Sequence, residues 1–465
     1  MKRILLIVGV IAGLLVVALA AAPFWLGMQT ESAFNNAMQT MASRSGLPKS
    51  DARFSRGWLG SDATSRFSLP GTPVVIEATH TIEHGPLPLS RLLAGEIAPA
   101  LARIESRLTM SPAKDAPPGL TTLLKALPPM QVVTKLDLAG NGASDITLPA
   151  GSRKSGEDLF KWTGVSGTML FDQDPTKIKG SLTLPSFQYE SKTSTLIVKN
   201  TSIDSDVYEG TAGYMFGRSS LSIGSVSMAP FMEVSGVHMA AIIQPKGKFA
   251  TINISYGVKK MDLAKDGYGP GNLNIAIRNL DAATLKQFED ELNKVNARPM
   301  PEEQKQMMLA GKLMEYVGKL TRNDPEIEVT KLSIIAPGGE LSGKAKFVIQ
   351  GKDQDLSANP MLILTAIKGS AELAMPESLA KALVMPQIQR DLALLQEEGK
   401  LSRDDADNLS PEAIDQIAEQ AYPRYLNESG FGRWFVRDSN GYRFSLSINR
   451  GQVVVNGVPM TGGKP

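Results

Sequence analysis

The chain has 465 residues, 42% of them apolar, and a formal net charge of +2 from 49 Lys and Arg against 47 Asp and Glu. This balance, with no basic stripe that carries interleaved aromatic residues, excludes the electrostatic signature of a nucleic-acid-binding protein. A chain of this length and apolar content can bury a large core, so it is not a disordered stalk. It contains no cysteine, which is compatible with an oxidising compartment.

An uncharged stretch, Ile4 to Leu26, follows Lys2 and Arg3 at the amino terminus. As a helix it would span roughly 34 Å, which is enough for a hydrocarbon layer of about 30 Å. Positive charge on the short side favours a cytoplasmic stub of residues 1–3 and an exported remainder, residues 27–465. The sequence therefore predicts a single transmembrane helix over residues 4–26.

A cleavable secretory signal is the alternative, because Ala18-Leu19-Ala20 and Ala20-Ala21-Ala22 have the small-x-small form of a cleavage site. The apolar core of a signal peptide runs about 7–15 residues, and this one is longer and ends near Trp25, an aromatic residue typical of a membrane interface. A retained anchor is therefore favoured over secretion after cleavage.

Most of the remaining chain alternates apolar and polar residues with a period of two, as half-buried strands do. Glycine, asparagine, aspartate and serine separate these runs at short intervals, which indicates hairpins and meanders of antiparallel sheet. The clearest runs are 74–82, 252–258, 273–277, 341–349 and 442–448.

Helical patterns interrupt the strands. A short one covers residues 34–41, and two larger helical insertions are predicted at about 283–320 and 376–422, the second with start signals at Pro376-Glu377. The proline-rich stretch 112–129 is interpreted as a linker or loop and a possible subdivision of the exported domain. The predicted fold is mainly β with helical insertions: one transmembrane helix followed by a large, elongated, mostly antiparallel β assembly.

The chain has three histidines, His80, His84 and His238. On a strand, residues four apart stand about 13 Å from each other, too far to share one metal ion. The alternation around His80 and His84 favours a strand, so structural roles are predicted for all three and no metal site is predicted.

The glycine-rich stretch 267–271 is followed by Asn272 to Ile277, which alternates as a strand. A phosphate-binding loop would open a helix at that point, so a turn or bulge is the better interpretation and no cofactor is predicted. Two Ser-x-x-Lys matches, at Ser111 and Ser378, lack the partner signatures of serine-nucleophile enzymes. No other hydrolase motif is present, so a noncatalytic protein is predicted.

Several motifs recur in a characteristic order along nearly the whole chain: Trp25-Leu26-Gly27, Phe54 to Trp58, His84-Gly85-Pro86, Gly267-Tyr268-Gly269, Asn279-Leu280-Asp281, Pro325 to Gly339, and Gly451 to Gly457. With this order the chain resembles the YdgA family of bacterial envelope proteins, a family of unknown function. The resemblance implies one amino-terminal anchor, a large β-rich envelope domain and no assigned activity. With the predicted anchor, it places the protein in the inner membrane with its large domain in the periplasm.

The family-like positions are predicted to be fold-determining rather than catalytic. They are Arg56, Gly57, Trp58, His84, Gly85, Pro86, Gly269 and Gly457. Gly57 can take left-handed backbone or let the Trp58 ring pack closely on the sheet, and Pro86 ends a strand. A ligand contact by Arg56, Trp58 or His84 is the functional alternative.

The function predicted from the sequence is noncatalytic binding or scaffolding of a lipid or another hydrophobic ligand at an apolar sheet face. An envelope protein is the second predicted partner, which would make the chain a protein-interaction module without ligand. The alternative from another functional class is an envelope hydrolase that acts on glycan or lipid.

Overall fold

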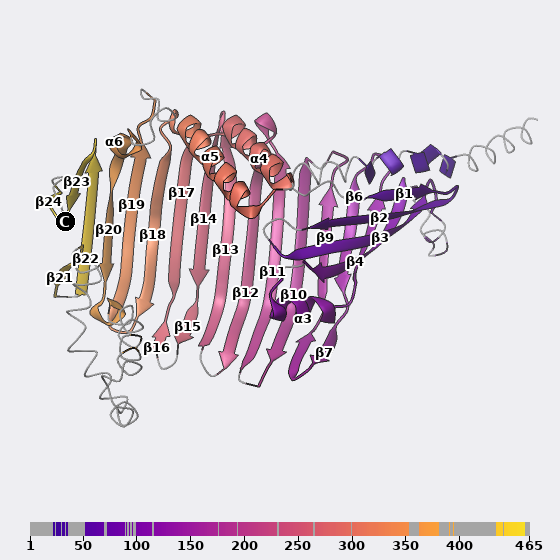
Figure 1. Ribbon diagram of the computed structural model, residues 1–465, viewed down its shortest axis with the longest axis horizontal. Helices are drawn as coiled ribbons and strands as arrows, with labels where there is room; N and C mark the ends of the chain where they lie inside the picture. Colours follow the sequence, from indigo (N-terminus) through magenta and orange to yellow (C-terminus); the bar gives the residue numbers. More distant parts are fainter. Residues whose placement is uncertain are drawn as a thin grey trace, which may run out of the picture. The chain divides into compact units, whose positions relative to one another are not determined.

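The computed structural model describes most of the chain from residue 52 to residue 460, together with parts of residues 22–35. The described residues are 22–23, 25–28, 30–32, 34–35, 52–68, 72–88, 90, 93, 95, 99–113, 116–174, 176–192, 194–229, 232–263, 266–298, 300–352, 362–380, 390, 394, 434–439 and 441–460. The order of the elements along the chain can be followed in Figure 1.

The predicted transmembrane helix is contradicted by the structure. No helix in the described part of the chain combines the length and the apolar character that crossing a bilayer requires. Of the predicted span, only residues 22, 23, 25 and 26 are among the described residues, and residues 4–21 and 24 lie outside them. The membrane partner and the inner-membrane location with a periplasmic domain depended on this helix, so both predictions are corrected with it.

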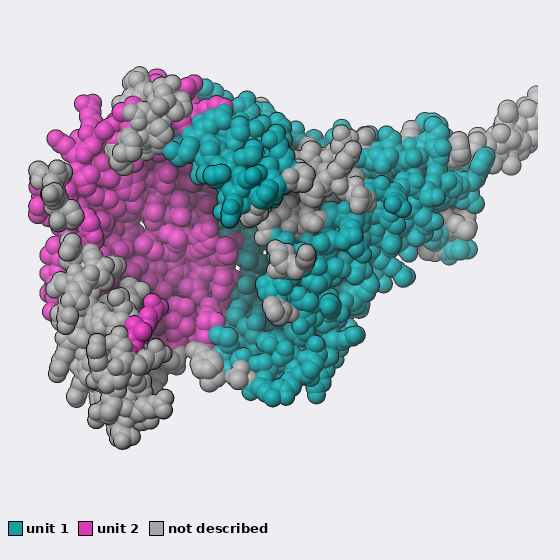
Figure 2. Space-filling view, viewed as in Figure 1, with its two compact units in different colours: residues 1–230, 240–248, 281–317 teal, residues 231–239, 249–280, 318–465 magenta. Residues whose placement is uncertain are grey.

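The chain divides into two compact units, shown in separate colours in Figure 2. Unit 1 contains residues 1–230, 240–248 and 281–317, and unit 2 contains residues 231–239, 249–280 and 318–465. The border between them does not fall at residues 112–129.

Unit 1 is built on antiparallel strands. Its strands are β1 (Arg53–Arg56), β2 (Gly60–Ser68), β3 (Val74–His84), β4 (Ala102–Pro112), β5 (Met130–Leu136), β6 (Gly142–Leu148), β7 (Gly151–Ser155), β8 (Asp158–Trp162), β9 (Val165–Phe171), β10 (Lys177–Glu190), β11 (Thr195–Glu209), β12 (Met215–Ala229) and residues 240–246 of β13 (Met232–Lys246). Strands β1 to β6 pair in chain order, and β6 then pairs with β9, which leaves the β7–β8 hairpin as an insertion between them. Strand β10 pairs with β8 and β9 on one side and β11 on the other, and β11 pairs with β12.

The predicted alternation holds in this sheet, and the strand predicted at 74–82 is confirmed as part of β3. Cross-strand pairing places Ile82 opposite Ile104, and both belong to a core with Ala102 and Leu136. Leu26 and Phe34, from the helical residues between 22 and 35, complete this core. One face of the sheet is therefore covered at this end by a helical segment that precedes it in the chain.

The interpretation of residues 112–129 as a linker is wrong. Strand β4 continues to Pro112, and residues Pro118–Ala126 form helix α3, with proline in its first turn where no backbone donor is needed. Helix α3 contacts β4 and β7, and Ala126 packs in a second core with Leu148, Phe160 and Trp162.

The helical insertion at 283–320 is confirmed as α4 (Ala282–Ala297) and α5 (Glu302–Thr321). Asp281 caps α4 by accepting a hydrogen bond from the Thr284 amide at 2.9 Å. The rings of Phe288 and Tyr316 lie 5.2 Å apart and join the two helices. Of the second insertion, at 376–422, and the short helix at 34–41, most residues lie outside the described part of the chain.

Unit 2 is a second antiparallel assembly. Its elements are residues 232–239 of β13 (Met232–Lys246), then β14 (Phe249–Val258), β15 (Lys260–Leu263), β16 (Asp266–Tyr268), β17 (Gly271–Asp281), β18 (Glu326–Ala336), β19 (Gly339–Ile349), α6 (Ile363–Ala366), β20 (Ile367–Met375), β21 (Val436–Asp438), β22 (Gly441–Asn449), β23 (Gln452–Val455) and β24 (Val458–Pro459). The runs predicted at 252–258, 273–277, 341–349 and 442–448 are confirmed as strands.

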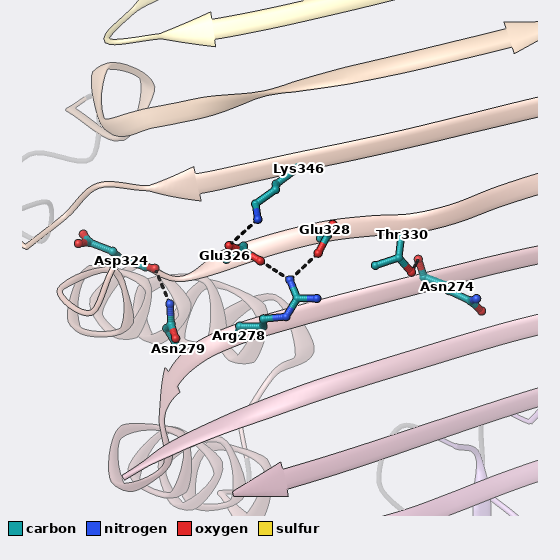
Figure 3. A network of polar contacts seen from close by, with 8 residues as sticks. All are labelled: Asn274, Arg278, Asn279, Asp324, Glu326, Glu328, Thr330 and Lys346. Atoms are coloured by element: carbon teal, nitrogen blue, oxygen red, sulfur yellow. Dashed lines mark hydrogen bonds and ion pairs between the residues drawn. The ribbon is translucent and has the colours of Figure 1, made fainter. Parts of the chain in front are cut away.

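A network of charged side chains ties three neighbouring strands of unit 2 together (Figure 3). Arg278 on β17 donates hydrogen bonds to Glu326 and Glu328 on β18, and Lys346 on β19 lies 3.0 Å from Glu326. Partial burial would raise the pKa of Glu326, but the hydrogen bonds from Lys346 and Arg278 outweigh it and lower that pKa. The network therefore links the side chains of β17, β18 and β19 across both strand pairings.

Candidate functional site

A cavity of about 830 Å³ lies in unit 1 where five strands begin or end. It is bounded by the ends of β5, β9 and β11 and by the starts of β6 and β10. Its lining residues are Pro99, Ala100, Lys135, Leu136, Asp137, Asn141, Gly142, Ala143, Leu170, Phe171, Asp172, Lys177, Ile178, Lys179, Asp206, Val207 and Tyr208.

Two tight turns, each closed by an aspartate, form part of the cavity. In the β5–β6 turn, Asp137 accepts hydrogen bonds from the backbone and side-chain nitrogens of Asn141, both at 2.9 Å. In the β9–β10 turn, Asp172 accepts from the Thr176 amide at 2.6 Å, the Thr176 hydroxyl at 2.5 Å and the Lys177 amide at 3.0 Å. Aspartate is suited to this task because its short side chain reaches amides a few residues ahead.

The pairing of β6 with β9 brings the two turns side by side. Gly142 lies opposite Phe171 in this pairing, and a Cβ atom at residue 142 would stand 2.0 Å from Cζ of the Phe171 ring. The ring therefore occupies the space that a side chain at residue 142 would take. Phe171 also packs against the core that contains Leu136, so one wall of the cavity is continuous with the core.

Lysines and exposed apolar groups share the neighbouring row, which points to the face of the sheet opposite to Leu136 and Phe171. Lys135 pairs with Ala143, Ala143 with Leu170, and Leu170 with Lys179 across β5, β6, β9 and β10. Side chains directly opposite each other in an antiparallel sheet point to the same face. Leu170 is 52% exposed in this row and lines the cavity.

The carboxylates of the two turns are held in the ionised form. The side-chain hydrogen bond from Asn141 is the largest cause that lowers the pKa of Asp137, and the one from Thr176 does the same for Asp172. Neither carboxyl group is therefore suited to donate a proton near neutral pH.

The histidines lie elsewhere in unit 1. His80 and His84 are both on β3, as predicted. The Nε2 atom of His84 is 2.9 Å from Ser61 Oγ, and His80 is 3.1 Å from Ser65 Oγ and 2.7 Å from Ser106 Oγ. Burial lowers the pKa of both histidines. Neither of them lines the cavity, and no group of three metal-ligating side chains occurs among the described residues.

The segment Arg56-Gly57-Trp58 forms the end of β1 and the turn into β2. The Gly57 amide donates to the Gly60 carbonyl at 2.9 Å, and Arg56 forms an ion pair with Glu31 at 3.2 Å. Trp58 is 57% exposed, so the close packing on the sheet that was expected for its ring is wrong. None of these three residues lines the cavity.

The remaining family-like positions are in turns and at strand ends. A Cβ atom at Gly85 would lie 1.7 Å from the Ala100 carbonyl oxygen, so only glycine allows this backbone approach before Pro86. Gly269 follows β16, where its amide donates to the Ile335 carbonyl at 2.7 Å. Gly457 has a φ of 80° in the β23–β24 turn, a left-handed conformation that favours glycine. These contacts give each position a local role in the backbone.

Comparison with known proteins places the chain in a family. A family model described as "Bacterial protein of unknown function (DUF945)" matches residues 1–462. The chain belongs to this family. It is also similar to Protein YdgA of Escherichia coli (strain K12), with 21% identity over 228 residues. That match covers 46% of this chain and 44% of the relative, so the chain spans less than half of the length of the relative it matches.

The sequence patterns did not indicate the cavity residues of this DUF945 protein. They are common residue types at strand ends and in turns, and the cavity depends on the pairing of β6 with β9 across the β7–β8 insertion. The two short turns, Asp137 to Asn141 and Asp172 to Thr176, are the local signal that could have located its rim.

Proposed function

We propose that this protein binds a lipid or another hydrophobic small molecule and holds it without transforming it. The observation that supports this proposal is the cavity of about 830 Å³, whose mainly apolar lining includes Phe171, Ile178 and Val207. Cavities of about 300–1,000 Å³ with apolar linings and a few polar groups are typical of small-molecule sites.

The polar groups around the cavity favour binding over catalysis. The carboxylates of Asp137 and Asp172 are occupied by their own turns. The Ser61–His84 pair is buried and does not line the cavity, and the described lining contains no serine, threonine, cysteine or histidine. A hydrolase that acts on glycan or lipid needs a nucleophile or water beside a base within reach of its substrate.

Binding of a neutral fluorescent probe, N-phenyl-1-naphthylamine, tests the proposal. We expect saturable binding, and a loss of affinity of about tenfold or more in Leu170→Asp, because Leu170 lines the cavity and a carboxylate covered by an apolar ligand is costly to desolvate. Leu138→Asp is the matched control, since Leu138 is exposed in the β5–β6 turn and does not line the cavity. Absence of saturable binding to the unmodified protein, or equal loss in both variants, would reject the proposal.

A protein-interaction role is the second candidate, and it is favoured by the exposure of Trp58 together with Leu59 at the β1–β2 turn. Exposed aromatic residues are frequent anchors of protein interfaces. A photo-crosslinking residue at position 58 should then capture a discrete partner in cells, whereas the same residue at Leu313, exposed on α5, should not. Equal capture at both positions would count against this role.

A further inference from the structure

We infer that the polar face of strands β9 to β12 in unit 1 carries a second binding site, which takes an uncharged saccharide. The site is a groove of about 540 Å³, which is within the usual size range of small-molecule sites. It is separate from the proposed binding of a hydrophobic molecule and does not depend on it. Its lining residues are Thr168, Leu170, Lys179, Gly180, Ser181, Asp204, Ser205, Asp206, Arg218 and Ser220.

Strand pairing places the side chains of the groove in two rows across β9, β10, β11 and β12. In strand order, the first row is Leu170, Lys179, Asp206 and Arg218, and the second row is Thr168, Ser181, Asp204 and Ser220. On each strand the two residues are two positions apart, so both rows point to the same face of the sheet. Gly180 and Ser205 pair with each other between the rows, and their backbone forms the floor of the groove.

The charged side chains of the groove balance each other. Lys179 and Arg218 are positive, and Asp204 and Asp206 are negative. Asp206 stands between the two cations in its row, and Asp204 lies two residues before it on β11. An anionic ligand would therefore meet two carboxylates and a cationic ligand would meet two cations, whereas an uncharged ligand is repelled by neither pair.

These charged groups are available to a ligand. Lys179 and Asp206 are 3.7 Å apart and both side chains are 70% exposed, so their ion pair contributes little and a ligand can replace it. The side chains of Asp204 and Arg218 form no hydrogen bond or ion pair with any residue in the part of the chain that the structure describes. A carboxylate and a guanidinium thus face the groove with unused hydrogen-bonding capacity.

A saccharide has the hydrogen-bonding groups that this lining requires. Each sugar hydroxyl both donates and accepts, so neighbouring hydroxyls can donate to Asp204 and accept from Arg218 in charge-assisted hydrogen bonds. The hydroxyl oxygens of Thr168 and Ser181, 3.3 Å apart, supply further partners, and the half-exposed Leu170 offers an apolar contact for the C–H groups of a sugar ring. A purely apolar ligand would instead cover four charges without satisfying them, which is costly.

Glucose, glucuronate and glucosamine test this inference, because they share one ring and differ in charge. Saturation-transfer NMR with the full chain, at a slightly acidic pH that keeps glucosamine protonated, measures the affinity for each sugar. We expect saturable binding of glucose, and binding of each charged sugar that is about fivefold weaker or more. Asp204→Asn and Arg218→Met should each weaken glucose binding about fivefold or more, because each removes a charge-assisted hydrogen bond. Asp204→Asn should also improve glucuronate relative to glucose, and Arg218→Met should improve glucosamine, because each variant unbalances the charges of the groove.

Asp145→Asn is the matched control, since Asp145 lies opposite Thr168 on β6 but does not line the groove. No saturable binding of glucose, tighter binding of a charged sugar to the unmodified protein, or an equal loss in the control would overturn the inference. Asp204 and Arg218 do not line the strand-end cavity, so N-phenyl-1-naphthylamine should bind both variants as it binds the unmodified protein. A parallel loss of this probe would show that groove and cavity act as one site and would also overturn the inference, whereas the probe's failure to bind the unmodified protein rejects only the proposed function.

Discussion

Gly27 and His84 are in such close contact that a Cβ atom at residue 27 would lie 2.4 Å from Cε1 of the imidazole. His84 is only 3% exposed, and its Nε2 atom faces Ser61 Oγ at 2.9 Å. Close by, the ring of Phe34 meets that of His80 edge to face at 5.4 Å. Gly27 and Phe34, from the helical residues between 22 and 35, therefore pack against His84 and His80 of β3. Glycine at position 27 allows its backbone to lie close to the His84 ring.

Replacing Gly27 with alanine should destabilise unit 1. The added methyl group would overlap the imidazole, which is held from the other side by Ser61, so we expect a loss of about 1–3 kcal/mol in the free energy of unfolding, as for other overpacked sites. Denaturant unfolding measures this loss. Gly311→Ala on α5 is the control, because a Cβ there meets nothing within 4 Å and should stabilise the helix by about 0.5–1 kcal/mol. Equal effects of the two substitutions would show that the contact at His84 is not tight.

The stability of the protein should fall as the pH drops below about 6.5. Burial lowers the pKa values of His80 and His84 in the folded state, so the unfolded chain binds protons more readily than the folded one. Their contribution is fully present above the unfolded pKa, and it is lost as the pH falls toward the lower folded values. Arg56 adds to the effect at His84, because its positive charge opposes protonation.

Denaturant unfolding between pH 7.5 and pH 5.5 measures this dependence. The double variant His80→Gln and His84→Gln should have a smaller slope of unfolding free energy against pH, since glutamine does not titrate. His238→Gln is the control, and a slope that decreases equally in this variant would contradict the assignment to His80 and His84.

Truncation of two tryptophans of unit 1 should change the free energy of unfolding by very different amounts. Trp162 is 7% exposed and donates from Nε1 to the Pro149 carbonyl at 2.7 Å, so Trp162→Ala should cost about 3–5 kcal/mol. Trp58 is more than half exposed, so Trp58→Ala should change the free energy of unfolding by about 0.5 kcal/mol or less. Thermal and denaturant unfolding compare the two, and a large loss in Trp58→Ala would mean that its ring packs more than its exposure indicates.

The charged network of unit 2 should depend on its arginine. Arg278→Met leaves Glu326 and Glu328 without their shared donor, and we expect a loss of about 1–3 kcal/mol, which is usual for hydrogen bonds to partly buried charged groups. Lys344→Met removes a strongly exposed pair with Glu372 and should cost about 0.5 kcal/mol or less. Urea titrations of both variants test the difference. Similar losses would indicate that the network acts as an ordinary surface ion pair.

The sequence determined the strands and the side to which each residue points. The alternation in the runs 341–349 and 442–448 follows from the strand period of two, and the same period sets Phe347 and Ile448 on the apolar side. Helices α4 and α5 were also readable, because their apolar residues recur at helical spacing. These features are local, so a single sequence is enough to recognise them.

The tertiary structure alone decided where distant segments meet. Composition assigned Pro112 to Pro129 to a loop, but contacts of α3 with β4 and β7 stabilise a helix there. The Gly57-Trp58 pair suggested a packed Trp58, but the ring is more than half exposed at the β1–β2 turn. The cavity depends on the pairing of Gly142 with Phe171 across an inserted hairpin, a long-range contact that leaves no periodic trace in the sequence. The spacing of apolar residues therefore specified the strands and helices. The candidate site formed because β6 and β9, which are not adjacent in the chain, pair with each other.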